Sequence, residues 1–538
     1  MKPILYLRLL PWFLCLLSFG ALRAQPALNA VAQEVQIAHA TDKKFVPLRP
    51  FKRVLLPLGD ERKALQRELK QYTILDYTAP AFDAASAPDA IQLSIPRGDG
   101  PAIQLDLVKA TVLTTDFTLV TSAGDSPRFE RAIHYRGVDP ENPNSIAAIS
   151  FLPGEMMGVI NVDDHTLVLG KIMTAKDQKH VFYRAADLVE SFTGSCDTEA
   201  KPFSKDQQPL LESMAKGEAL GLEKSGGCVQ VYLELEHDLV TEKGGAAGAT
   251  NFITGLWNVV ATLYQNENIA TQISQIFAWT TPDSYPTTGG TTAALYSFRS
   301  ARPSFNGDLA HLISRGAPAN GGVAFLDGLC NPNAAYAYSY IYSGYAAVPT
   351  YSWSVNVLAH EMGHNLGSRH THACVWNGNN TAIDGCGPAV GANEGCNAPL
   401  PTNGGTIMSY CHLVSSVGIN FINGFGNQPG NLIRANVAAA SCLSGCSNGG
   451  CPVLTYQITG VSCNGAADGG LTVSPQGGTP PYTYLWSTGA TTASISNLTA
   501  GTYTVTVTDG GNCSEVGAAV VSEPAPINAP AGMLQASP

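Results

Sequence analysis

The stretch 360–370 constrains the fold of this 538-residue chain more than any other. His360 and His364 are four residues apart, so on an α-helix their side chains lie on one face, about one turn apart. Gly367 can adopt a positive φ that ends the helix, and the turn that follows can bring His370 round to the same point. Three imidazole nitrogens with a fourth position left open are typical of a catalytic zinc site rather than a closed structural one. The spacing therefore predicts that these three histidines bind one zinc ion.

Glu361 directly follows the first histidine, so its carboxylate can lie beside the open position of the metal. Zinc lowers the pKa of a bound water to about 7. A carboxylate at this position can take the proton as that water attacks a carbonyl carbon, and can pass it to the leaving amine. The alternative is a helix with solvated histidines, but chance would produce the five-residue pattern on the order of once in ten thousand such chains. We therefore predict that Glu361 is a general base.

The stretch 360–370, HEMGHNLGSRH, matches the metzincin signature of zinc-dependent endopeptidases. Metzincins also have a methionine turn some tens of residues downstream, and the segment 405–411, GTIMSYC, resembles it with Met408 as the methionine. The surrounding chain resembles the adamalysin/reprolysin branch and its bacterial relatives over most of residues 50–445. Many reprolysins have an aspartate after the third histidine, where this chain has Thr371. That departure concerns the subfamily, and the zinc prediction does not depend on it.

The resemblance implies a fold and further roles. Residues 227–446 would form an α/β (α+β) metzincin catalytic domain with a mixed sheet. Its edge strand at 322–326 would pair with an extended protein or peptide substrate by β-augmentation. Met408 would pack beneath the zinc ion without touching the substrate. Tyr410 would either stabilise the oxyanion, as a tyrosine does in astacin- and serralysin-like metzincins, or be a core or rim residue.

A calcium ion is a second candidate cofactor, because an aspartate that matches Asp308 contributes to a calcium site in relatives. The strand glutamate of those relatives aligns with Gln230 here, which carries no charge. We therefore expect Asp308 to be a solvated residue at the start of a helix over 308–314. His372 is expected at the rim of the zinc site.

Periodicity and turn signals predict the other elements of this domain. Strands are expected at 229–235 and 272–279. A helix is expected from Thr250, as its N-cap, to Tyr264. The predicted zinc helix and closing helix are 352–366 and 431–440.

Residues 1–24 are predicted to be a secretory signal peptide, because Lys2 and Arg8 precede an apolar run at 9–22 that is short for a membrane span. No other segment could span a membrane, so no transmembrane anchor is expected. We expect a secreted, extracellular or cell-surface protein, bacterial by its resemblance. The net charge is −11 and there is no long basic run, so nucleic-acid binding is not expected.

Residues 25–226 are predicted to be a β-rich propeptide followed by an exposed linker at 205–226, where activation cleavage would occur. The segments 134–137, HYRG, and 145–150, SIAAIS, resemble the reprolysin propeptide. The alternative is an unrelated β-domain that binds a ligand. Alternating apolar runs predict strands within it, at 103–108, 117–121, 147–151 and 158–162.

Cys196 is the single cysteine of the predicted propeptide. In many metzincin zymogens a propeptide cysteine fills the open zinc position, and Cys196 would do so here. The alternative is a disulfide with Cys228, and parity favours it: of 13 cysteines, 12 remain without Cys15, and eleven without Cys196 as well. A disulfide of Cys330 with either Cys442 or Cys446 is expected to tie the subdomains together.

Residues 452–524 are predicted to form an all-β sandwich with Trp486 and Tyr503 in its core. The segments around 463–486 and 501–505 resemble the SprB-type repeat of bacterial surface adhesins. A cell-surface or matrix contact through this repeat would follow. The last residues, 525–538, are rich in proline and alanine and are predicted to be disordered.

Together these features predict a multidomain, secreted zinc endopeptidase made as a zymogen. One alternative is a surface adhesin or binding protein whose metal site is inactive or structural, and another is a zinc hydrolase of a non-protein substrate. The intact Glu361 favours an active site, since an abandoned site commonly loses its base.

Overall fold

The computed structural model describes residues 29–524 apart from short gaps. The gaps are 42, 56–59, 99, 164, 175–177, 191, 193, 199–226, 317–320, 342–345, 393, 447–451, 477–480 and 511–513. The predicted signal peptide, the linker at 205–226 and the tail at 525–538 lie outside the described residues. None of the described helices has the length and apolar character that a bilayer crossing requires.

The N-terminal region, residues 29–198, builds a ten-stranded sheet in the order β1-β4-β5-β7-β8-β9-β10-β11-β3-β2. Neighbouring strands are antiparallel except for β1 and β4. The predicted strands at 103–108, 147–151 and 158–162 are confirmed as parts of β5, β8 and β9. The elements are α1 (Ala30–Ala40), β1 (Phe45–Leu48), β2 (Phe51–Arg53), α2 (Asp60–Glu68), β3 (Thr73–Tyr77), β4 (Ala90–Ile95), β5 (Ile103–Ala110), β7 (Ile133–Asp139), β8 (Asn142–Leu152), β9 (Glu155–Val162), β10 (His165–Lys171) and β11 (Lys179–Arg184).

The central domain, residues 227–446, is built on a seven-stranded mixed sheet in the order β12-β16-β17-β15-β13-β14-β6. Only β16 and β17 are antiparallel to each other. Both edge strands come from the N-terminal region, because β6 pairs with β14 and β12 pairs with β16. The strands are β6 (Leu113–Thr121), β12 (Ser195–Cys196), β13 (Cys228–Leu235), β14 (Ala270–Ala278), β15 (Leu309–Ser314), β16 (Gly321–Ala324) and β17 (Tyr336–Tyr340).

One sequence-based prediction about these elements is wrong. The segment predicted to begin a helix at Asp308 is the strand β15, in which every residue is buried. A short run that is buried on both faces has no alternation, so periodicity alone does not distinguish it from a helix. The predicted strand at 117–121 does exist, within β6, but it extends the central sheet instead of the N-terminal one.

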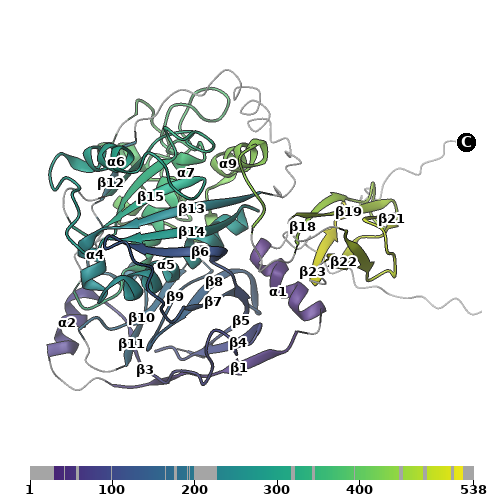
Figure 1. Ribbon diagram of the computed structural model, residues 1–538, viewed down its shortest axis with the longest axis horizontal. Coiled ribbons are helices and arrows are strands. Elements are labelled where there is room, and N and C mark those ends of the chain that lie inside the picture. Colours follow the sequence, from purple (N-terminus) through teal and green to yellow (C-terminus); the bar gives the residue numbers. More distant parts are fainter. Residues whose placement is uncertain are drawn as a thin grey trace, which may run out of the picture.

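Helices cover the central sheet, and α5 lies between it and the N-terminal sheet (Figure 1). The predicted N-cap at Thr250 is wrong: α5 begins after Gly245, and Thr250 is fully buried within the helix. The predicted zinc helix and closing helix are confirmed, each with slightly different bounds. The helices are α4 (His237–Glu242), α5 (Ala246–Asn266), α6 (Gly290–Ala301), α7 (Tyr351–Asn365), α8 (Cys386–Ala389) and α9 (Asn427–Ala439).

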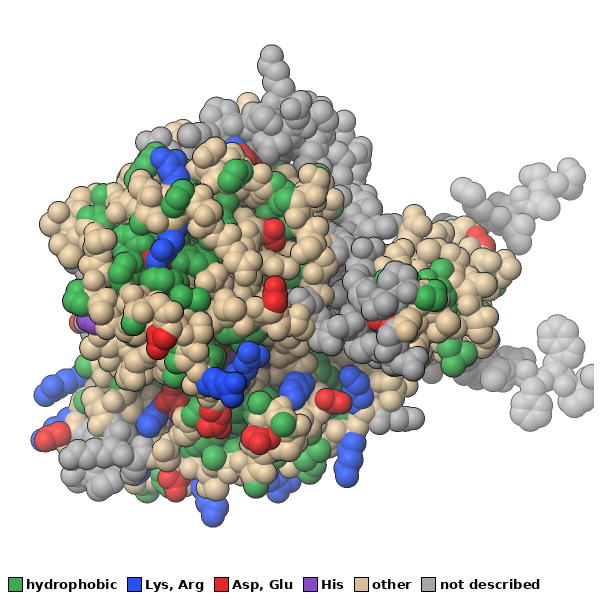
Figure 2. Space-filling model, in the orientation of Figure 1, with side chains coloured by type: hydrophobic (Ala, Val, Ile, Leu, Met, Phe, Trp, Pro, Cys, Tyr) green, Lys and Arg blue, Asp and Glu red, His purple; other side chains and the backbone are tan. Residues whose placement is uncertain are grey.

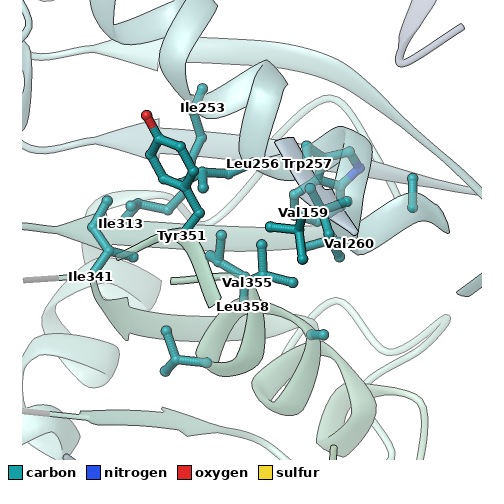
Figure 3. Close-up of a cluster of buried hydrophobic side chains, with 14 of the residues drawn as sticks. Val159, Ile253, Leu256, Trp257, Val260, Ile313, Ile341, Tyr351, Val355 and Leu358 are labelled. Atoms are coloured by element: carbon teal, nitrogen blue, oxygen red, sulfur yellow. The ribbon is translucent and has the colours of Figure 1, made fainter. Parts of the chain in front are cut away.

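One hydrophobic core joins the N-terminal region to the central domain. Figure 3 shows Val159 of β9 beside Trp257 and Val260 of α5, with Val355 and Leu358 of α7 below them. All five side chains are buried. The two parts of the chain therefore pack as one unit rather than as separable domains.

Polar contacts reinforce this shared core. The side-chain amide of Asn258, in the middle of α5, donates to the carbonyl oxygens of Tyr135 and Ile149, at 3.2 Å each. Its oxygen accepts a hydrogen bond from Arg136 Nε at 3.0 Å. Because buried polar groups are costly when unpaired, these contacts fix the position of α5 on the N-terminal sheet.

Four disulfides cross-link the central domain: Cys228–Cys446, Cys330–Cys442, Cys374–Cys396 and Cys386–Cys411. The predicted tie from Cys330 is confirmed with Cys442 as the partner. The alternative of a disulfide between Cys196 and Cys228 is wrong, because Cys228 is bonded elsewhere and Cys196 is free.

The C-terminal domain, residues 452–524, lies to one side of the two larger sheets, next to α1 (Figure 1). It consists of two three-stranded antiparallel sheets, β18-β19-β21 and β20-β22-β23. Trp486 is 2% exposed in its core, whereas Tyr503 is only partly buried against it. The strands are β18 (Val453–Thr459), β19 (Gly469–Gln476), β20 (Thr483–Trp486), β21 (Ser494–Leu498), β22 (Gly501–Thr508) and β23 (Ser514–Val521).

Charged side chains do not gather by sign on the face in view. Figure 2 shows Lys and Arg interspersed with Asp and Glu over the lower part of the molecule, with fewer charges above. This face therefore has no continuous basic surface of the kind that binds phosphate backbones.

Replacing Leu256 with Ala should destabilise both parts of the shared core together. The Leu256 side chain is 0% exposed within the joint cluster, and such a truncation costs about 2–5 kcal/mol. Chemical unfolding should show one transition for both parts, shifted to lower denaturant. Val189→Ala is the control, because Val189 is 48% exposed and its truncation should change stability by less than about 0.5 kcal/mol. A shift confined to the central domain would contradict a shared core.

Candidate metal centre

The helix α7 ends where the chain turns back toward it. Gly367 has a φ of 101°, and an added Cβ there would lie 2.1 Å from the side-chain amide of Asn436. A side chain at this position would be both strained and obstructed. The backbone N–H of Ser368 donates to Gly363 O at 2.9 Å, which completes the turn. The turn carries the chain from α7 to His370, on the same side as the two helical histidines.

The three histidines converge on one point. His364 Nε2 lies 3.2 Å from His360 Nε2 and 3.2 Å from His370 Nε2. All three residues are buried, with at most 3% of their surface exposed. Two of them come from successive turns of α7 and the third from the segment beyond the turn at Gly367.

The Nδ1 atom of each ring has a hydrogen-bond acceptor. His360 Nδ1 lies 2.7 Å from Ile407 O, His364 Nδ1 lies 2.7 Å from Ser368 O, and His370 Nδ1 lies 2.8 Å from a carboxylate oxygen. A carbonyl or carboxylate oxygen only accepts, so each Nδ1 carries the proton and each Nε2 presents a lone pair.

Burial lowers the pKa of His360 and of His364 well below the usual value, and the neighbouring His370 lowers both further. Three neutral imidazoles thus direct lone pairs at one buried point. This donor set fits a zinc ion.

Cys196 and Glu361 lie at the same point. Cys196 Sγ is 3.4 Å from His364 Nε2 and 3.4 Å from Glu361 Oε2. The sulfur and the nitrogens of His360, His364 and His370 are all within 4.8 Å of one another. Burial raises the pKa of Glu361 well above its usual value, and burial followed by the nearby Glu361 carboxylate raises the pKa of the Cys196 thiol.

The edge strand β16 covers the carboxylate of Glu361. A Cβ added to Gly322 would lie 2.3 Å from Glu361 Oε1, so glycine allows this close approach. The strand β12 pairs with β16 in parallel, with Cys196 opposite Gly322. Asp197 N donates to Gly322 O at 3.0 Å, which continues the pairing. A segment of the N-terminal region therefore occupies the free edge of the sheet directly above the histidines.

Met408 packs against α7, and the Tyr410 ring lies beside those of His360 and His370. Met408 is fully buried, and a Cβ added to Gly363 of α7 would lie 2.6 Å from its sulfur. Tyr410 is also buried, and its hydroxyl accepts a hydrogen bond from Cys196 N at 3.0 Å and donates to Cys196 O. Two hydrogen bonds of the Tyr410 hydroxyl therefore fix the backbone of β12 at Cys196.

A small cavity lies beside Glu361, between α7 and the segment that follows Met408. Phe192, close to this cavity, stacks on Trp353 of α7 with ring centroids 5.1 Å apart. His412 Nε2 lies 2.9 Å from Gly194 O. The N-terminal segment thus fills much of the cleft along α7. The cavity is lined by Gly194, Ser195, Cys196, Gly321, Gly322, Trp353, Asn356, Val357, His360, Glu361, Tyr410 and His412.

Sequence reasoning missed Glu394 and placed His372 wrongly at the rim. His372 is 1% exposed, and its ring stacks on that of His370 at 4.9 Å. The carboxylate of Glu394 lies 2.8 Å from His370 Nδ1 and 3.1 Å from His372 Nε2. Burial alone would raise the pKa of Glu394, but the hydrogen bonds from the two histidines outweigh it and hold the pKa at about 2. The disulfide Cys374–Cys396 returns residue 394 to the neighbourhood of residue 372, but its connectivity cannot be read from the sequence, so no sequence signal pointed to Glu394.

Asp308 does not begin a helix, which corrects the predicted role. It precedes β15, is partly buried, and its carboxylate accepts a hydrogen bond from Gln230 N at 2.8 Å. Within the described ranges it belongs to no group of three or more His, Cys, Asp or Glu side chains that could hold an ion.

Comparison with known proteins matches two parts of the chain. Residues 227–417 match a reprolysin-type family described as metallo-peptidase family M12, and residues 455–491 match the SprB repeat. Disintegrin and metalloproteinase domain-containing protein 1 of Rattus norvegicus is 25% identical over 259 residues, which cover 45% of this chain and 31% of the rat protein. The chain thus spans about a third of that relative's length.

Among solved structures, metalloproteinase-II from Bacteroides fragilis is similar with a TM-score of 0.32 and 12% identity, over 52% of this chain and 81% of that one. Residues 227–417 are therefore similar to the reprolysin-type members of metallopeptidase family M12, and residues 455–491 are similar to the SprB repeat.

Proposed function

We propose that this protein is a secreted zinc-dependent endopeptidase made as a zymogen. The observation that carries the proposal is the convergence of His360, His364 and His370 beside Glu361, beneath the edge of a sheet. The match of residues 227–417 to metallopeptidase family M12 supports the same function.

A bound zinc ion would supply a water of lowered pKa and would polarise the carbonyl of the substrate. His360, His364 and His370 would hold it through Nε2, with each ring oriented through its Nδ1 hydrogen bond. Glu361 would take the proton from the attacking water and deliver it to the leaving amine. Its burial beneath β16 would exclude bulk water from this transfer.

The edge of β16 favours a peptide as the substrate. In the zymogen this edge pairs with Ser195 and Cys196 through main-chain contacts. After release of that segment, an extended protein or peptide substrate would pair with the same edge, largely independently of its side chains. This pairing argues against the alternative of a non-protein substrate.

Cys196 supports the zymogen. Its sulfur lies among the three ligand nitrogens, where it would block the position that the attacking water needs. Tyr410 holds the backbone of Cys196, and Phe192 packs on Trp353. These contacts would keep the active site closed until the N-terminal region leaves.

The SprB repeat supports an alternative, a surface adhesin with an inactive metal site. The retained Glu361 favours the peptidase instead. Both functions share a location: four disulfides fit an oxidising, extracellular environment, and the repeat fits contact with a cell surface or matrix. The SprB repeat would then hold the peptidase domain close to substrates on that surface.

Replacing Glu361 with Gln should abolish cleavage while zinc stays bound. The variant keeps the size of the side chain but loses the base, so the rate on an unfolded protein substrate should fall about 10²–10⁴-fold. The measurement compares chains cut within the predicted linker at 205–226 and freed of the N-terminal region, with zinc content determined for each. Zinc bound to the wild-type chain without any cleavage would favour the adhesin.

Replacing Cys196 with Ser in the uncut chain should weaken the block. With Co²⁺ in place of zinc, the wild type should show near-ultraviolet absorption from thiolate-to-metal charge transfer, and the variant should lack it. The cleavage rate of the uncut Cys196→Ser variant should be roughly tenfold or more above that of the uncut wild type. A loss of about 1.4 kcal/mol in the interaction of residue 196 with the metal corresponds to a tenfold change in the open fraction. Cys463→Ser is the control, since Cys463 is also free but lies exposed in the C-terminal domain. Identical spectra for wild type and Cys196→Ser would contradict the proposed block.

A cut within the predicted linker at 205–226 should not by itself release the N-terminal region. The strand β6 would stay paired with β14, and the carboxylate of Glu68 would stay bound to the N–H groups of Ala346, Ala347 and Val348. Size-exclusion chromatography of the cut protein should therefore show both parts eluting together, and denaturant should separate them. Separate elution in plain buffer would contradict this prediction.

A further inference from the structure

We infer that Glu394 is a positioning residue that holds His370 in the orientation required to bind the metal. The inference rests on the proposed function, since it concerns one of the proposed zinc ligands. Glu394 Oε1 lies 2.8 Å from His370 Nδ1, on the side of the ring away from the ligand point. A carboxylate at this position fixes the tautomer and orientation of the ring and makes its other nitrogen a better ligand.

The third histidine differs from the other two in how it is held. His360 and His364 donate to backbone carbonyls of Ile407 and Ser368. His370 donates to a side chain carried by a separate loop. Its ring orientation therefore depends on a residue that can be replaced without altering the backbone.

His372 holds the Glu394 carboxylate from a second direction. Its Nε2 lies 3.1 Å from Oε1, and its ring stacks on that of His370 with an interplanar angle of 8°. Thr371, between the two histidines, donates its hydroxyl to Met408 O instead of to this carboxylate. Glu394 thus supplies the negative charge behind the third ligand.

The disulfide Cys374–Cys396 fixes the loop that carries Glu394. Cys396 is two residues beyond Glu394, and Cys374 Sγ lies 3.1 Å from the carbonyl oxygen of Glu394. On the other side, Trp376 Nε1 donates to His370 O at 2.7 Å. The loop therefore holds both the backbone and the ring of the third ligand.

The test is the zinc affinity of the full chain, measured by competition with a chelator of known affinity. Glu394→Ala should bind zinc about 10–100-fold more weakly than the wild type. Glu394→Gln should lose less, because its amide oxygen can still accept the Nδ1 hydrogen bond. Both variants should also change the visible absorption of the Co²⁺-loaded chain, which reports ligand geometry.

Glu267→Gln is the matched control. Glu267 is another buried carboxylate of the central domain, and it pairs with Arg434 and accepts a hydrogen bond from Phe425 N instead of from a histidine. This variant should lower the stability to unfolding and leave zinc affinity unchanged. His372→Gln should weaken zinc binding less than Glu394→Ala, because the His370–Glu394 contact remains.

The outcomes separate the inference from the function on which it rests. A folded Glu394→Ala chain with wild-type zinc affinity and an unchanged Co²⁺ spectrum would overturn the inference alone. Equal losses of affinity in Glu394→Ala and Glu267→Gln would also overturn it, since the effect would then follow stability. A wild-type chain that binds no zinc would overturn both the inference and the proposed function.

Discussion

The rest of the site depends on three buried imidazoles, each of which donates a hydrogen bond from its Nδ1 atom. Each of these hydrogen bonds fixes a tautomer and directs the Nε2 lone pair at the same point. Three lone pairs facing one another in a buried space are unfavourable without a cation between them. Three segments supply the acceptors that maintain this arrangement. They are the turn at Gly367, the segment around Met408 and the loop of Glu394.

The N-terminal region takes part in the same construction rather than covering a finished domain. It supplies both edge strands of the central sheet and one side of the core around α5. Sheet edges expose unpaired backbone groups that readily pair with another strand. At β14 the pairing with β6 completes the sheet, and at β16 the pairing with β12 also occupies the edge above Glu361. The same strand pairings therefore complete the central sheet and cover the site.

Local patterns were enough to predict the elements that have a clear period or end signal. The strands at 229–235 and 272–279 and the two helices near 352–366 and 431–440 were predicted within a few residues. The prediction of a helix at 308–314 was wrong, because a strand that is buried on both faces has no alternation of polar and apolar residues. The strand in β6 was predicted, but its sheet was not, because only packing across the chain decides which sheet a strand joins.

The same distinction explains which parts of the site the sequence could reveal. His360, His364 and Glu361 are related by the helical repeat, and His370 by one glycine turn, so their spacing carries the information. Glu394 reaches His370 across 24 residues without a regular element between them. Its place depends on which cysteines pair, and connectivity is not deducible from the order of cysteines in the chain. The proposed metal ligands and base are therefore visible in the sequence, whereas the residue proposed to orient a ligand becomes visible only once the disulfide has placed its loop.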